Sequence, residues 1–89
     1  MHKIVNKKQL NHDMFWLEFE ASYVAKKAKP GQFIIFRVDE YGERVPLTMA
    51  GSDKDKGTVT IIFQSVGRST KLLSQLEVGD SILDVSGPL

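Results

Sequence analysis

The sequence predicts an all-β protein, a six-stranded antiparallel Greek-key barrel with one short helix near the C-terminus. Three observations indicate this class. Apolar and polar residues alternate over several short segments, which is the period of a strand. Glycine, proline, asparagine and aspartate mark turns between these segments at short intervals, as in small barrels. One segment alone, close to the C-terminus, has apolar residues at helical spacing.

The composition limits what such a chain can do. Its 89 residues are 42% hydrophobic and 26% charged, which is typical of one globular domain. The absence of cysteine excludes disulfides and an iron–sulfur cluster held by this chain, and with two histidines we predict no metal site. Twelve basic and eleven acidic residues argue against nucleic-acid binding. No apolar run could span a bilayer, so we expect a cytoplasmic domain.

The first three strands are predicted at residues 3–10, 14–20 and 33–38. The second has the clearest alternation, because Phe15, Leu17 and Phe19 share one face and the polar residues occupy the other. Residues 21–29 are weakly helical or irregular, and the chain turns at residues 30–31.

Three more strands are predicted at residues 45–50, 58–66 and 81–85. Pro46 cannot donate to a ladder, so the fourth strand must be at an edge or interrupted there. The fifth strand is rich in β-branched residues. Between the fifth and sixth, residues 67–76 are predicted to be the helix, with Ser69 or Thr70 as its N-cap.

Two segments have residues that suit an anionic ligand. Arg44, Pro46 and Thr48 would share one face of a strand, where a guanidinium could bind phosphate and a hydroxyl could bind a polar ring. The simpler explanation is an exposed edge strand. The second segment, 67–70, joins a strand to a helix, and a glycine with two hydroxyls at a helix start is a plausible diphosphate site. Alone, it is better explained as a capped helix. Neither segment contains a catalytic triad.

Five motifs taken in order are more specific. They are Pro30-Gly31-Gln32-Phe33, Arg44-Val45-Pro46-Leu47-Thr48, Val66-Gly67-Arg68-Ser69-Thr70, Val78-Gly79-Asp80 and Gly87-Pro88-Leu89. Together they resemble the FAD-binding barrel of the ferredoxin–NADP reductase superfamily over essentially the whole chain. The resemblance is strongest to the small flavin subunits of sulfide dehydrogenase and NADH-dependent ferredoxin:NADP oxidoreductase. The electron-transfer subunit of dihydroorotate dehydrogenase is a more distant match.

The resemblance implies roles for these residues. Thr48, the candidate catalytic residue, would offer its hydroxyl to flavin N5, and Arg44 would neutralise the diphosphate of FAD. The helix start would hold that diphosphate. The complete set of implied cofactor-binding residues is Arg44, Pro46, Leu47, Thr48, Ile62, Phe63, Gly67, Arg68, Ser69 and Thr70.

Two departures from the family pattern affect these roles. Arg44 precedes Thr48 by four positions, whereas many relatives have a spacing of three, so Arg68 could share the phosphate contact. Leu47 stands where relatives often have an aromatic residue, so no aromatic ring can stack on the flavin from there.

The same resemblance implies a longer reductase. Residues 1–89 would be its FAD-binding barrel, and a following domain, absent here, would bind NAD(P)H. Hydride would pass to FAD N5 and electrons would leave singly to an iron–sulfur partner subunit or ferredoxin. The isolated barrel could lose FAD or self-associate through the exposed flavin face.

Two other functions remain open on the sequence. A barrel of the translation-factor type would dock a protein or RNA and bind no flavin. An assembly subunit could keep the barrel and lose the cofactor, although Arg44 and Thr48 argue against that loss. The decisive feature is whether Thr48 and residues 67–70 converge on one cleft.

Overall fold

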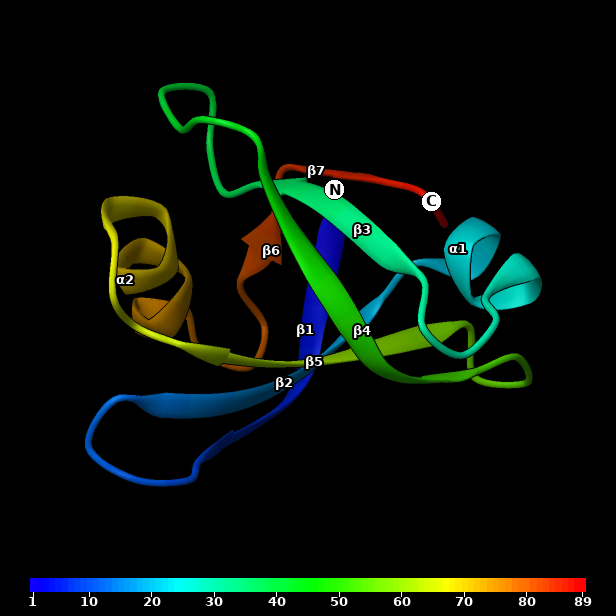
Figure 1. Ribbon diagram of the computed structural model, residues 1–89, viewed down its shortest axis with the longest axis horizontal. Coiled ribbons are helices and arrows are strands. Elements are labelled where there is room, and N and C mark those ends of the chain that lie inside the picture. Colours follow the sequence, from blue (N-terminus) through cyan, green and yellow to red (C-terminus); the bar gives the residue numbers. More distant parts are fainter.

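The computed structural model describes all residues from 1 to 89 and has seven strands and two helices (Figure 1). The strands form one antiparallel sheet in the order β6-β1-β2-β5-β4-β3-β7. Its two outer strands, β6 and β7, follow each other in the chain, so the sheet curls into a nearly closed barrel. The elements are β1 (His2–Gln9), β2 (Met14–Glu20), α1 (Ser22–Lys27), β3 (Phe33–Arg37), β4 (Val45–Asp53), β5 (Thr58–Gln64), α2 (Arg68–Gln75), β6 (Ser81–Ile82) and β7 (Asp84–Ser86).

The inward-facing residues of these strands form the core. Fifteen buried hydrophobic residues make one cluster, to which every strand from β1 to β6, except β4, contributes at least one member. On β2 the predicted apolar face is the buried one, because Phe15, Leu17 and Phe19 are all less than 9% exposed. Phe15 stacks on Phe63 of β5 with ring centres 5.8 Å apart. The alternation read from the sequence therefore gives the correct inner face of β2.

The all-β barrel is confirmed, but two of the predicted element counts are wrong. The segment predicted as a sixth strand is two short strands, because at Leu83 the backbone N–H turns aside to bond the carbonyl of Val38. Residues 22–27 form the short helix α1, whose Val24 and Ala25 are buried against the barrel. Tertiary packing of two small apolar residues stabilises this turn of helix, which is too short to be stable alone.

Strand β4 changes partners along its length. Its first half pairs with β3, from Phe36 opposite Val45 to Phe33 opposite Thr48. Its second half pairs with β5, starting at Met49 opposite Ile61. Before Met49, β4 therefore has no ladder partner on the β5 side. The strand runs through Pro46 without a break and pairs there with β3, so the proline lies at an edge and does not interrupt the strand. The barrel is open along this edge.

The turn before β5 contains a close approach that requires glycine. Gly57 has a φ of +69°, and a Cβ there would lie 2.8 Å from the Ser22 hydroxyl oxygen and 3.4 Å from Ser22 Cα. Gly31 has a φ of +85° and open space around it.

We expect Gly57→Ala to destabilise the protein more than Gly31→Ala. Each substitution places a Cβ in the left-handed region, which costs about 1–2 kcal/mol, and Gly57→Ala adds the clash with Ser22. Urea unfolding of the two variants measures the difference. Equal losses of stability would show that the contact with Ser22 relaxes without cost.

Candidate cofactor-binding site

Three of the predicted site residues share the outer face of β4 and of the residue just before it. Arg44, Pro46 and Thr48 are exposed, and the residues between them face inward. The period of two therefore survives the proline, as the sequence predicts. The result is a row consisting of a cation, a rigid apolar ring and a hydroxyl along the strand that borders the opening of the barrel.

The open edge of β4 adds backbone donors to this row. The N–H of Met49 bonds the carbonyl of Gln32 on the β3 side. Because N–H groups alternate in direction along an antiparallel strand, the N–H of Thr48 points toward the open side. The backbone nitrogen of Pro46 points to the same open side. Proline has no N–H, so no donor is left unpaired at that position. Thr48 thus offers a hydroxyl and a backbone N–H next to each other.

The start of α2 differs from the sequence prediction. Gly67, and not Ser69 or Thr70, is the N-cap residue. The Thr70 hydroxyl accepts hydrogen bonds from the N–H groups of Val66 (3.1 Å) and Gly67 (2.9 Å), and donates one to the carbonyl of Gly67 (3.1 Å). A hydroxyl has one hydrogen and two lone pairs, so that of Thr70 has no capacity left for a ligand. Its role is to close the loop that precedes the helix.

Ser69 has the opposite character. It is 7% exposed and lies in the first turn of α2, and its hydroxyl makes none of the side-chain hydrogen bonds around this helix. It lines a pocket of about 210 Å³ between the start of α2 and the loop before β4. The first N–H groups of a helix lack intrahelical partners and carry a partial positive charge. The pocket therefore has donors suited to an anion. Its residues are Tyr41, Gly42, Glu43, Arg68, Ser69 and Leu72.

Arg44 is held by an acidic residue from the far end of the chain. Its Nη2 lies 3.3 Å from Asp84 Oδ2, and Arg37 Nη2 lies 3.1 Å from the same oxygen. Two guanidiniums share one carboxylate, so the cluster keeps a net positive charge. The Nε of Arg37 is buried without a partner. Sequence reasoning missed Arg37 and Asp84. Asp84 is 47 positions from Arg37 and 40 positions from Arg44 in the chain, so both contacts depend on strand pairing.

Ile62 and Phe63 lie on opposite faces of β5. Ile62 is 42% exposed on the outer face, whereas Phe63 is 3% exposed and stacks in the core. The prediction that both contact a cofactor is therefore wrong for Phe63, since adjacent residues of a strand cannot face the same side. Leu47 also faces inward and packs, half-buried, against the core cluster.

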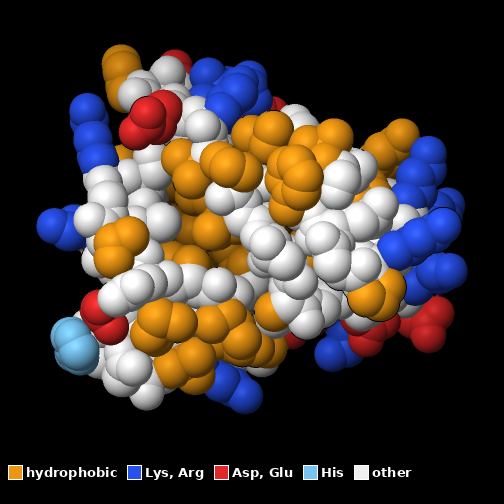
Figure 2. Space-filling model, viewed as in Figure 1, with side chains coloured by type: hydrophobic (Ala, Val, Ile, Leu, Met, Phe, Trp, Pro, Cys, Tyr) orange, Lys and Arg blue, Asp and Glu red, His pale blue; other side chains and the backbone are white.

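The elements that bear these residues surround one hollow. Figure 2 shows hydrophobic side chains gathered in and around a depression in the area where Figure 1 places β4 and α2. The pocket at the start of α2 lies at one end of the row on β4. A second pocket of about 520 Å³, lined by Ala50 and Ile62 among others, lies beyond Thr48 at the other end. Each end of the row therefore has its own pocket.

Comparison with known proteins identifies similar domains. Residues 1–89 match a protein family described as the oxidoreductase FAD-binding domain. The chain is 56% identical over 89 residues to an uncharacterized protein in the adh 3′ region of Clostridium beijerinckii, and covers 30% of that protein. It is 40% identical over 89 residues to a Thermotoga maritima homolog of the electron transfer subunit of dihydroorotate dehydrogenase B (NAD⁺), and covers 32% of it. All of this chain aligns in both cases.

A solved structure has almost the same backbone. An NADH-dependent reduced ferredoxin–NADP oxidoreductase, studied for flavin-based electron bifurcation, superimposes with a TM-score of 0.96 at 40% identity. The match covers 99% of this chain and 32% of that one. The chain thus spans about a third of the length of the relatives it matches.

Proposed function

Since this chain belongs to the family of oxidoreductase FAD-binding domains, we propose that it binds FAD along the outer face of β4, with the diphosphate at the start of α2. We further propose that residues 1–89 are the FAD-binding part of a longer reductase. That reductase passes electrons between NAD(P)H and an iron–sulfur protein or partner subunit. The names of the two similar proteins, an electron transfer subunit and a ferredoxin–NADP oxidoreductase, support this activity.

The observation that carries the proposal is the change of partner along β4. Because β4 leaves β5 before Met49, the Thr48 N–H and hydroxyl lie at an unpaired strand edge. We infer that this edge and the first turn of α2 hold the same ligand. A barrel that served only to dock a macromolecule would have no need for an unpaired strand edge with free donors. Ser69, which lines the pocket at the start of α2, adds a hydroxyl that makes no side-chain hydrogen bond there.

The residues present fit a flavin dinucleotide. Thr48 supplies two donors for the polar edge of a ring, and Pro46 and Ile62 supply exposed apolar surface for its faces. Arg44, Ser69 and the N–H groups at 68–70 supply positive charge and donors for a diphosphate, and Gly67 leaves room beside them. When bound, FAD supplies the hydride- and electron-accepting ring that no side chain of this protein has. The role of the protein is to hold that ring and to balance charge.

The longer protein and its partners follow from the proposed activity. The portion of the relatives that this chain does not cover is long enough for a nicotinamide-binding domain, which we propose lies beyond the barrel. We also propose that the longer protein has an iron–sulfur partner and a cytoplasmic location. No helix in the structure has the length and apolarity needed to cross a membrane.

The test is flavin binding by the natural protein that contains residues 1–89. We expect visible flavin absorption in the purified protein, or its appearance on titration with FAD. Thr48→Ala is expected to weaken FAD binding about two- to tenfold, since a neutral hydrogen bond contributes about 0.5–1.5 kcal/mol. Thr48→Ser should restore most of the loss.

Ser86→Ala is the matched control, because Ser86 is an exposed hydroxyl on β7, which lies across β3 from β4. A folded protein that takes up no FAD would overturn the proposal and favour a docking barrel. Equal effects of Thr48→Ala and Ser86→Ala would remove Thr48 from the site.

A further inference from the structure

Lys7 is a largely buried lysine that the site described above does not use. It lies on β1, its side chain is 14% exposed, and its ammonium nitrogen is 5.6 Å from the centre of the Phe15 ring. Withdrawing an ammonium from water is costly unless hydrogen bonds and an opposite charge compensate. The groups that provide this compensation indicate what Lys7 does.

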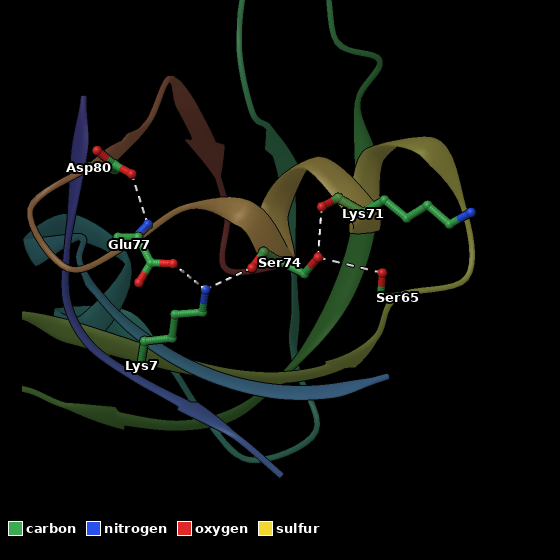
Figure 3. A network of polar contacts seen from close by, with 6 residues as sticks. All are labelled: Lys7, Ser65, Lys71, Ser74, Glu77 and Asp80. Atoms are coloured by element: carbon green, nitrogen blue, oxygen red, sulfur yellow. Dashed lines mark hydrogen bonds and ion pairs between the residues drawn. The ribbon is translucent and has the colours of Figure 1, made fainter. Parts of the chain in front are cut away.

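The polar partners of Lys7 are at the C-terminal end of α2 and in the loop just after it (Figure 3). Its Nζ donates to the carbonyl oxygen of Ser74 at 2.7 Å and lies 3.2 Å from Glu77 Oε1. Ser74 is in the last turn of the helix, where carbonyl oxygens lack intrahelical partners and carry partial negative charge. Lys7 therefore caps α2 with a charge of the favourable sign.

Further contacts hold the same end of the helix. The Ser74 hydroxyl donates to the carbonyl of Lys71 at 2.7 Å and lies 3.5 Å from the Ser65 hydroxyl. The N–H of Glu77 donates to Asp80 at 2.8 Å (Figure 3). These partners are all close to α2 in sequence, whereas Lys7 comes from the first strand, 67 residues before Ser74. Lys7 is thus a charged side chain of β1 that binds the end of the helix directly to the sheet.

We propose that Lys7 is a positioning residue that aligns α2 with the diphosphate of the cofactor and so gives the site its preference for FAD over flavins without phosphate. The inference rests on the proposed function. A helix of eight residues held at its C-terminal end presents the N–H groups of its first turn in one direction. Hydrogen bonds weaken steeply with misalignment, so tilting of α2 affects a bound diphosphate and leaves contacts to the flavin ring unchanged.

The test compares FAD with riboflavin, which has the same ring and no phosphate. In the natural protein, Lys7→Met is expected to lower the affinity for FAD about five- to tenfold, and that for riboflavin less than about twofold. A merely structural role would lower thermal stability and leave the ratio of the two affinities unchanged. Lys7→Arg keeps the charge and the reach to Ser74, so it should restore the ratio. Lys3→Met, at an exposed position of the same strand, removes an equal charge as the control.

The outcomes separate the two proposals. If the unmodified protein binds FAD no better than riboflavin, both the diphosphate site and the role of Lys7 are wrong. If it prefers FAD and Lys7→Met leaves that preference intact, the role of Lys7 is wrong and the proposed function stands. If Lys7→Met does not fold, Lys7→Gln is the second variant. Its neutral amide is polar and costs less to bury than a charged group, and the same ratio of FAD to riboflavin affinity is measured for it.

Discussion

Replacing Arg44 with methionine is expected to weaken FAD binding about ten- to hundredfold, because a charge-assisted hydrogen bond contributes about 1.5–3 kcal/mol. Arg44 is 53% exposed and uses Nη2 alone on Asp84, which leaves its other donors free for phosphate oxygens. Fluorescence titration with FAD at two salt concentrations measures both the loss and its electrostatic character. The salt dependence should be weaker in the variant, since one charge contact to the ligand is gone.

Lys54→Met is the control for the loss of charge, because Lys54 is exposed in the turn before β5, away from α2. Arg44→Lys keeps the charge without the planar fork and should bind FAD with intermediate affinity. If Arg44→Met binds FAD normally and Arg68→Met does not, the phosphate contact belongs to Arg68. This second arginine lines the pocket at the start of α2.

Substitutions at two neighbouring positions of β5 are expected to have opposite effects. Phe63→Ala should destabilise the protein by about 3–5 kcal/mol, because it removes a buried ring and leaves a cavity beside Phe15. Ile62→Ala should cost less than about 1 kcal/mol, since the side chain is 42% exposed. It should instead weaken FAD binding a few fold through lost apolar contact.

Urea unfolding without cofactor and FAD titration of the folded variants measure the two effects separately. For a domain of this size, the loss at Phe63 is a large part of the total stability, so titrations with that variant are made at low temperature. A Phe63→Ala protein of normal stability but impaired FAD binding would contradict the division of faces on β5. So would an Ile62→Ala protein that unfolds easily.

The local pattern was sufficient wherever an element is defined by its own residues. The alternation at Phe15, Leu17 and Phe19 determines the strand and its inner face, since burial of one side of a sheet requires a period of two. The same rule places Arg44, Pro46 and Thr48 on one face. It also places the adjacent residues Ile62 and Phe63 on opposite faces of β5, although the motif-based prediction assigns both to the cofactor site.

The tertiary structure decided what depends on contacts between distant segments. Nothing near Leu83 in the sequence indicates that its N–H bonds Val38 and divides a strand in two. The shared carboxylate of Asp84, the capping of α2 by Lys7 and the opening beside Thr48 have the same origin. Each requires the strands to be in register, and register is a property of the whole barrel. The sequence by itself therefore determined the barrel class and the residues on the outer face of β4. Only the pairing of the strands decided that Thr48 lies at an unpaired edge and that Arg44 contacts Asp84, because both depend on segments far apart in the chain.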